Sequence, residues 1–279
     1  MIQLTELQDA PLGKEVTYSE HYNPALLFPI PRPPKRQALG ITETLPFAGD
    51  DVWYSYELSW LNARGKPMVA LGKFTYSCDS PFLVESKSFK LYLNSFSITK
   101  FATIADVKKV MVKDLSAAVN SEVSVEIYLI SELPQQGNLG HFAGYCLDNL
   151  DVDCDTYEVN PDYLHADDNR IVHEVLYSDI IKSLCLKTGQ PDWASVQITY
   201  TGGEIDKEGL LKYLVSFRKH QGFHEHCMEQ IFMDILQRCK PQKLTLDGRV
   251  TRRGGLDIHL LRTTENPIPL RQDVRLWRQ

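Results

Sequence analysis

The spacing of apolar residues in the first half of the chain predicts two strands, two helices and a further strand. Apolar and polar residues alternate in the strand segments and recur at helical spacing in the helix segments. In chain order the segments are residues 53–60, 69–76, 86–97, 104–119 and 121–130. Gly65 and Pro67 lie between the first two segments, so these two strands are expected to form a hairpin.

The second half of the chain repeats this pattern. A strand is followed by two helices and two strands, at residues 194–201, 206–220, 225–239, 244–252 and 256–260. We therefore expect an α+β fold in which an antiparallel sheet with helices on one face is used twice.

The repeat is also visible in the residues themselves, which indicates an ancestral duplication. An offset of 124 residues places Gly65 and Pro67 on Gly189 and Pro191, and offsets of 121 and 120 align the helical segments. Residues that form the scaffold agree between the copies. The repeat predicts two units of similar architecture.

Reactive residues differ between the two copies. The second copy has Cys185, Asp192, His224 and Glu225, where the first copy has Leu61, Met68, Ile104 and Ala105. The first copy has Glu85-Ser86-Lys87-Ser88, where the second copy has Asp206-Lys207-Glu208-Gly209. Each copy has therefore kept reactive residues that the other copy has lost.

The segments outside the repeat complete the predicted domain organisation. Residues 1–50 hold seven of the fifteen prolines and predict an extended arm with little regular structure. Residues 132–170 are rich in Gly and Asp and predict a connecting segment. The two repeat units are then expected at residues 51–131 and 171–279.

Composition excludes several classes of protein. A formal net charge of −6 argues against direct binding to nucleic acid, which depends on neutralising phosphates. The chain has no apolar run of membrane-spanning length and no pattern of a secretion signal, and its six cysteines form no CxxC pair. These features predict a cytoplasmic protein that does not bind membranes. Neither a GxGxxG nor a GxxxxGK[ST] motif is present to hold a nucleotide.

Cys185 is a candidate nucleophile, with Asp192 as a candidate proton donor. Cys185 lies in a turn, where a backbone amide or a nearby cation could stabilise a thiolate, although free cysteines are more often buried packing residues. Asp192 could also cap the turn beside Pro191. His224 and Glu225 begin a predicted helix, where a carboxylate also favours the helix dipole. Their confinement to one copy favours the catalytic interpretation.

Glu85, Ser86 and Lys87 allow two interpretations. Glu85 and Ser86 could cap a helix whose exposed face carries Lys87 and Lys90. Alternatively, an acceptor and a cation at a helix N-terminus could bind a polar heterocycle and a phosphate.

A zinc site is a further alternative, because His220 and His224 are four residues apart and Cys185 could add a third ligand. Gly222 and Phe223 interrupt the helix pattern between the histidines, which argues against helical i, i+4 geometry. We therefore predict no bound metal.

The segment from Glu85 to Tyr92 (ESKSFKLY) resembles the signature motif of the NADPH-dependent 7-cyano-7-deazaguanine reductases, the nitrile reductases of queuosine biosynthesis, which contributes to tRNA modification. The segments from Cys185 to Asp192 and from Phe223 to Glu225 are similar to the catalytic segments of that family. The resemblance covers essentially the whole chain. The long form of that family has two tandem halves, with the signature motif in the first half and the cysteine in the second, as found here. It implies two tandem tunnelling-fold (T-fold) units, the fold of GTP cyclohydrolase I, and a homodimer.

The resemblance also implies a mechanism and a set of site residues. Cys185 would attack the nitrile of 7-cyano-7-deazaguanine to form a thioimide, and two NADPH molecules would complete the four-electron reduction without a metal. Asp192 and His224 would handle protons. Substrate contacts would come from Val84, Glu85, Ser86, His224 and Glu225, and cofactor contacts from Ser86, Lys87, Arg253 and Gly254.

Two other functions remain open from the sequence. One is a zinc-dependent pterin or purine enzyme of the GTP cyclohydrolase I-like fold, which stoichiometric zinc would identify. The other is a non-catalytic purine-binding module, which would bind the nitrile without consuming NADPH. The presence of Cys185 and Asp192 in only one copy argues against the binding module.

Overall fold

The structure is a computed structural model that describes residues 21–133, 139–186, 188–271 and 274–279. The first twenty residues of the predicted arm and part of the predicted connecting segment lie outside the described residues. Two compact units are present. The first contains residues 21–42, 51–133 and 252–258, and the second contains the other described residues.

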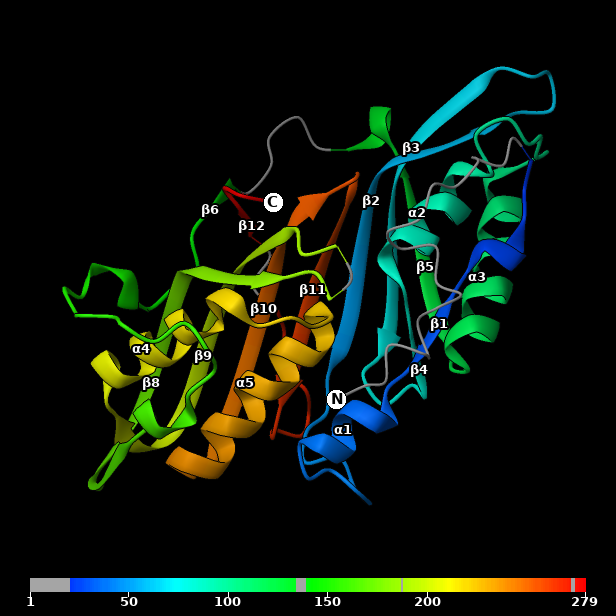
Figure 1. Ribbon diagram of the computed structural model, residues 1–279. Coiled ribbons are helices and arrows are strands. Elements are labelled where there is room, and N and C mark those ends of the chain that lie inside the picture. Colours follow the sequence, from blue (N-terminus) through cyan, green and yellow to red (C-terminus); the bar gives the residue numbers. More distant parts are fainter. Residues whose placement is uncertain (1–20, 134–138, 187, 272–273) are drawn as a thin grey trace. The chain divides into compact units, whose positions relative to one another are not determined.

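The first unit has an antiparallel sheet with its strands in the order β5-β3-β2, followed by the start of β11. Its elements are η2 (Pro24–Leu26), β1 (Pro29–Pro31), α1 (Pro33–Ala38), β2 (Asp50–Leu61), β3 (Pro67–Ser77), β4 (Phe82–Val84), α2 (Ser86–Asn94), α3 (Ile104–Val119), β5 (Val123–Leu129) and η3 (Ile130–Glu132). Ala70 of β3 lies opposite Leu129 of β5. Phe89 of α2 packs edge-on against Trp53 and Phe74, so α2 covers one face of β2 and β3 (Figure 1).

The second unit has its strands in the order β11-β10-β9-β8-β7. Its elements are β6 (Leu139–Gly140), β7 (Tyr145–Cys146), η4 (Leu147–Asn149), η5 (Pro161–Tyr163), β8 (Ala166–Leu184), β9 (Pro191–Ile205), α4 (Lys207–Val215), η6 (Ser216–Lys219), α5 (His224–Cys239), β10 (Lys243–Arg253), β11 (Leu256–Thr263) and β12 (Arg275–Leu276). Helices α4 and α5 lie on one face of this sheet (Figure 1). Antiparallel pairing predominates among the described strands, with short parallel pairs of β12 with β6 and of β7 with β8 in the second unit, which confirms the α+β fold class. None of the helices in the described part of the chain is long and apolar enough to cross a membrane.

The helices of the two units match residue for residue, as the sequence repeat predicted. The 121-residue offset converts the bounds of α2 into those of α4, and the 120-residue offset converts those of α3 into those of α5. Glu85 and Asp206 each cap a helix by accepting two backbone N–H groups, and such a cap typically contributes about 1 kcal/mol. Equivalent side-chain hydrogen bonds join Tyr92 to Asp114 and Tyr213 to Asp234.

The duplication extends into the predicted arm and the predicted connecting segment. Asn23 and Asn160 each cap a short 3₁₀ helix that begins with proline, and their N–H groups donate to Ser95 and Ser216. Five residues after each Asn, the carbonyl oxygens of Phe28 and His165 accept the N–H groups of Glu85 and Asp206. These segments therefore hold the start of α2 and of α4 in the same way.

The predicted arm is not wholly extended in its described part. Pro33 and Pro34 open helix α1, where their missing N–H groups would have no partner inside the helix anyway. Arg36 of α1 is buried and donates to the carbonyl oxygen of Cys78. The expectation of an arm with little regular structure was therefore wrong for this segment.

Strand β8 is a 19-residue strand that the sequence pattern did not predict. Its first residues are exposed and polar, and its pairing with β9 is irregular between Asp167 and Ile171. Alternation is lost there, so the strand signal is weak. Ala166 pairs with Ile205 as Pro29 of β1 pairs with Val84, so the start of β8 corresponds to β1.

One residue pairing of the duplication changes in the structure. Leu61 N–H donates to the Thr99 carbonyl oxygen, and the Leu61 carbonyl oxygen accepts the Phe101 N–H. Leu184 makes the same two bonds, to the His220 carbonyl oxygen and from the Gly222 N–H. Leu61 therefore corresponds to Leu184, and Cys185 corresponds to Asn62. The pairing of Cys185 with Leu61 was wrong by one residue.

The cause is the length of the hairpin loop. Cys185 N–H bonds to the Gln190 carbonyl oxygen, whereas Asn62 N–H bonds to that of Lys66. The loop of the second copy is therefore one residue longer, and an ungapped alignment misses this difference.

Candidate active site

Cys185 lies in the loop of the β8–β9 hairpin. Its N–H donates to the Gln190 carbonyl oxygen (2.8 Å), and its own carbonyl oxygen accepts the Gly189 N–H (3.0 Å). Gly189 has a φ of +67°, in the left-handed region that favours glycine. Both backbone groups of Cys185 are thus fixed, and its side chain is buried.

Asp192 lies in the same hairpin as Cys185. Ser183 of β8 is opposite Asp192 of β9, and Cys185 is two positions beyond Ser183. Cys185 follows the last residue of β8, and its backbone bond to Gln190 continues this register. Since side chains alternate along a strand, Cys185 is expected to face the same side of the hairpin as Asp192. Both side chains are buried. The hairpin therefore carries a buried thiol and a buried carboxyl group, and the carboxyl group could exchange protons with a bound molecule.

Helix α5 begins beside the Cys185 loop. Leu184 N–H donates to the His220 carbonyl oxygen (2.8 Å), and Gly222 N–H donates to the Leu184 carbonyl oxygen (3.2 Å). These bonds bring the start of α5, with His224 and Glu225, next to the residue that precedes Cys185. Glu225 is buried. The positive end of the helix dipole favours anions at this position.

Gly222 is a site residue that the sequence analysis did not single out. A Cβ on Gly222 would lie 3.1 Å from Cys227 Sγ and 3.1 Å from His220 Nε2. A side chain at this position would therefore require both neighbouring side chains to shift by a few tenths of an ångström. A Gly two residues before a helix start was the available signal.

The zinc alternative required His220 and His224 to lie one turn apart on a helix, and the structure does not have this geometry. His220 follows η6 in an extended conformation, whereas His224 is the first residue of α5, so they are not one turn apart on a helix. No group of three or more potential His, Cys, Asp or Glu ligands is found among the described residues.

In the first unit, Glu85 is the N-cap of α2. Its carboxylate accepts the N–H groups of Lys87 (2.8 Å) and Ser88 (2.7 Å), and its side chain is fully buried. The capping interpretation of Glu85 is therefore confirmed. Burial raises the pKa of this carboxyl group, and the two N–H groups offset only part of that shift. Val84 and Ser86 flank Glu85 in β4 and α2.

We expect Glu85→Gln to change the dependence of stability on pH. A carboxyl group whose pKa is raised by folding stabilises the protein below its unfolded pKa of about 4.3, and this contribution is lost as pH rises through the folded pKa. The wild type should therefore lose stability relative to Glu85→Gln as the pH is raised from about 4 to 7. Urea unfolding across this range measures the difference.

The exposed residue Glu122 supplies the control for loss of one negative charge, through Glu122→Gln. The raised pKa of Glu85 would be contradicted if the difference in free energy of unfolding between wild type and Glu85→Gln is constant with pH. It would also be contradicted if the wild type becomes relatively more stable as the pH rises.

The predicted cofactor residues lie at two places in the first unit. Ser86 and Lys87 form the first turn of α2, and Arg253 and Gly254 lie where β10 turns into β11. Arg252, beside them, lies over the Tyr56 ring, 4.8 Å from its centroid. Each of the two places thus offers cationic side chains to a ligand that carries several phosphates, as NADPH does.

Comparison with known proteins identifies the family. Residues 18–127 match the family described as "Nitrile reductase, 7-cyano-7-deazaguanine-reductase N-term", and residues 191–268 match the family described as "QueF-like protein". Together these matches span both copies of the repeat. The chain belongs to the NADPH-dependent 7-cyano-7-deazaguanine reductase family.

Similar proteins of that name occur in several bacteria. The protein of Legionella pneumophila is 51% identical over 269 residues, which cover 96% of this chain and 94% of that protein. The protein of Burkholderia multivorans is 51% identical over 273 residues (98% and 99%), and that of Ralstonia nicotianae is 52% identical over 275 residues (98% and 99%). These matches favour a reductase over the zinc-enzyme and binding-module alternatives.

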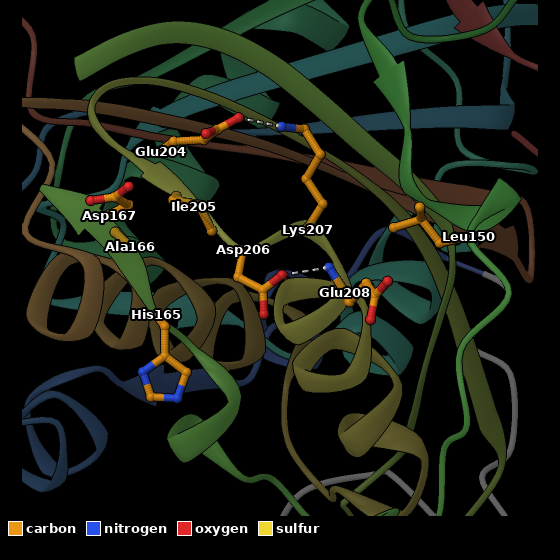
Figure 2. A pocket seen from close by; sticks show the side chains of 9 residues that line it. All are labelled: Leu150, His165, Ala166, Asp167, Glu204, Ile205, Asp206, Lys207 and Glu208. Carbon is orange, nitrogen blue, oxygen red and sulfur yellow. Dashed lines mark hydrogen bonds and ion pairs between the residues drawn. The ribbon is translucent and has the colours of Figure 1, made fainter. Parts of the chain in front are cut away.

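The second unit of this reductase-family chain has a pocket at the start of α4, the counterpart of the signature helix. The pocket has a volume of about 570 Å³. Figure 2 shows Asp206 accepting the Glu208 N–H and Lys207 reaching Glu204. Lys207 also pairs with Glu174 at 2.8 Å. The counterpart of Glu85 is thus retained as a helix cap, while an acidic residue, Glu208, replaces Lys87.

The site residues predicted from sequence therefore form two groups. Cys185, Asp192, His224 and Glu225 belong to the hairpin and helix start of the second unit. Val84, Glu85, Ser86, Lys87, Arg253 and Gly254 belong to the first unit. Gly255 continues the turn after Gly254 with a φ of +79°, and two glycines between two predicted strands are the hairpin signal that could have identified it.

Proposed function

We propose that the protein reduces the nitrile of 7-cyano-7-deazaguanine to the aminomethyl group of 7-aminomethyl-7-deazaguanine, with NADPH as the reductant, in the biosynthesis of the tRNA nucleoside queuosine. Family membership over both copies supports this activity. The single structural observation that supports the mechanism is that Cys185 and Asp192 are both buried in one hairpin, with Asp192 opposite Ser183, two positions before Cys185.

Cys185 is the nucleophile. Its thiolate sulfur attacks the electrophilic nitrile carbon, and one π bond of the nitrile becomes a lone pair on nitrogen. Asp192 delivers a proton to that nitrogen, which gives a covalent thioimide on Cys185.

NADPH supplies a hydride twice. After the first reduction, the lone pair on nitrogen expels the thiolate of Cys185 and forms an imine. The imine carbon then accepts the second hydride. His224, at the start of α5, is placed to assist these proton transfers. The nitrile carbon gains four electrons in total, and Cys185 returns to its starting state.

Recognition of the deazaguanine ring is assigned to carboxylates. Glu225 and Glu85 accept hydrogen bonds from the ring N–H groups, and Val84 and Ser86 line the substrate. A site that hydrogen-bonds substrate N–H groups rejects analogues that lack them, because buried acceptors would be left without partners. Ser86, Lys87, Arg253 and Gly254 contact the cofactor.

The finer architecture is part of the proposal. The two units are tandem tunnelling-fold units, with a unit at 51–131 that carries the signature motif and one at 171–279 that carries Cys185. Residues 1–50 and 132–170 are the arm and the connecting segment. The protein works as a homodimer in the cytoplasm, without direct contact with nucleic acid.

The stoichiometry of the reaction tests the proposed activity. Purified protein mixed with limiting 7-cyano-7-deazaguanine and excess NADPH should oxidise two NADPH for each amine formed, followed by nicotinamide absorbance and by chromatography of the product. Binding of the nitrile without oxidation of NADPH would instead identify a binding module. Activity that is lost with a chelator and restored by zinc would identify the metal enzyme.

Replacing both Lys87 and Arg253 with Ala should raise the KM for NADPH far more than the KM for NADH. These two cations are proposed to bind the phosphate that only NADPH carries, and charge-assisted hydrogen bonds are roughly twice as strong as neutral ones. Steady-state kinetics with each cofactor measures the two effects. Equal losses with NADPH and NADH would remove the two residues from recognition of that phosphate.

A further inference from the structure

Strand β8 contains a bulge a few residues before its end at the candidate active site. Ser178 of β8 lies opposite Val196 of β9, whereas Ile181 lies opposite Ala194. Three steps along β8 therefore match two steps along β9, so β8 carries one extra residue between Ser178 and Ile181. Bulges of this kind bend a strand and change the direction of the side chains that follow.

The bulge decides which residues of β8 share a face with Asp192. Beyond the bulge, Ser183 lies opposite Asp192. If the register before the bulge continued to the end of the strand, Lys182 would lie opposite Asp192 instead. A shift of one residue turns every side chain of a strand to the other face, so Cys185 would then face away from the side of Asp192. The bulge therefore sets the relation between the proposed nucleophile and the proposed proton donor.

Asp148, from the predicted connecting segment, binds the bulge through both oxygens of its carboxylate. Its Oδ1 accepts the hydroxyl group of Ser178 (2.6 Å), and its Oδ2 accepts the N–H of Asp179 (2.7 Å). Ser178 is fully buried, and so is Leu147, which precedes Asp148. Hydrogen bonds to a carboxylate are roughly twice as strong as neutral ones. Asp148 therefore gives the irregular part of the strand a strong and well-anchored partner.

Arg278 binds the same bulge and joins it to β9. One guanidinium nitrogen donates to the carbonyl oxygens of Asp179 on β8 and of Ala194 on β9. The ring centroid of Trp193 lies 6.0 Å from the Cζ atom of this guanidinium group. Ser195 of β9 also donates its hydroxyl group to the Asp179 carboxylate. Arg278 thus links the two strands at the point where their register changes.

The first copy has the same irregularity but holds it differently. In β2 the buried residues Ser55 and Leu58 are three positions apart, as the buried residues Ser178 and Ile181 are in β8. The N–H group that follows Ser55 donates to a backbone carbonyl oxygen of the β10–β11 turn (2.9 Å). The N–H group that follows Ser178 donates to the Asp148 side chain. The copy with the proposed nucleophile therefore uses a side chain that can be substituted.

We infer that Asp148 and Arg278 are positioning residues, which hold the β8 bulge so that Cys185 and Asp192 reach the nitrile together. This inference rests on the proposed function, in which Cys185 attacks the nitrile carbon and Asp192 protonates the nitrogen. Asp148 and Arg278 act through the register of the hairpin and not on the reacting atoms. A misplacement of about 1 Å at reacting groups can lower a rate about 10²-fold. Loss of either contact should therefore slow the attack by sulfur.

Asp148→Asn tests the first contact, because an amide has one oxygen where the carboxylate uses two. The full chain is mixed with 7-cyano-7-deazaguanine without NADPH, and the Cys185 adduct is followed over time by mass spectrometry. We expect its rate constant to fall about tenfold or more, with the final yield of adduct and the KM for NADPH unchanged. Asp151→Asn, at an exposed position of the same segment, is the matched control and should react at the wild-type rate.

Arg278→Met tests the second contact, because it removes both donated hydrogen bonds. The same rate constant should fall, although less than in Asp148→Asn, since Arg278 is exposed. Arg278→Lys should recover part of the rate, because an ammonium group can still donate to one of the two carbonyl oxygens. Arg64→Met, at an exposed position of the first unit, is the control for loss of one positive charge.

The rate constant and the final yield of adduct separate positioning from folding. A lower yield with the wild-type rate constant would show that the substitutions only unfold part of the protein, and would contradict the inference. A wild-type rate constant in both Asp148→Asn and Arg278→Met would also contradict it, while the proposed function would stand. If the wild type itself forms no adduct on Cys185, the proposed function is wrong and the inference falls with it.

Discussion

Cys185→Ala is expected to abolish nitrile reduction, and Cys185→Ser is expected to do the same. The proposed reaction begins with attack by sulfur, and neither a methyl group nor an unactivated hydroxyl group replaces a thiolate as a nucleophile. Cys185 is fixed through its backbone by Gln190 and Gly189, so either substitution should leave the loop in place. Oxidation of NADPH in the presence of the nitrile measures the loss.

Cys239 provides the matched control. Its thiol is buried at the end of α5, and burial raises its pKa to about 12, so it stays protonated and unreactive at neutral pH. Cys239→Ala should retain turnover. Full activity in Cys185→Ala would show that the sulfur of Cys185 takes no part in the reaction.

Asp192→Asn should lower kcat by about 10²–10⁴-fold, the range that general acid catalysis contributes. The amide cannot act as a general acid. Because it has nearly the same size as the carboxyl group, the hairpin should keep its register opposite Ser183. Asp192→Glu should restore part of the lost activity, because it again supplies a carboxyl group.

The exposed carboxylate Asp168, on β8, provides a control of equal charge change through Asp168→Asn. A comparable decrease in kcat in Asp168→Asn and Asp192→Asn would indicate an effect of net charge. An Asp192→Asn variant with normal kcat would remove Asp192 from proton transfer.

The regular elements of the fold were predictable because they obey simple periodicities. The helix expected at 104–119 has those bounds, and the strands expected at 53–60 and 69–76 lie within β2 and β3. The helix expected at 206–220 is shorter, because α4 ends at Val215 and continues as a 3₁₀ helix. Periodicity identifies apolar faces but defines helix ends poorly.

Other features needed three-dimensional contacts. The shared role of Asn23 and Asn160 depends on hydrogen bonds to Ser95 and Ser216, each more than 50 residues away in sequence. The extra residue in the Cys185 loop became evident only from backbone hydrogen bonds. Such long-range bonds leave no periodic signal in one sequence.

The candidate site was predictable in part. Divergence between the copies singled out Cys185 and Asp192, and the hairpin register then indicates that they share a face. The contacts of Asp148 with the β8 bulge could not be read from the sequence, because η4 and β8 come together only through the fold. The roles of individual residues come from the family resemblance combined with this geometry.

Incubation of the enzyme with 7-cyano-7-deazaguanine in the absence of NADPH tests the central claim most directly. Covalent attack needs no hydride, so intact-protein mass spectrometry should show the added mass of one nitrile per chain, and peptide mapping should place it on Cys185. Cys185→Ala should show no added mass, and Cys239→Ala should show the same adduct as the wild type. An adduct on another cysteine, or turnover without any adduct on Cys185, would contradict the thioimide mechanism.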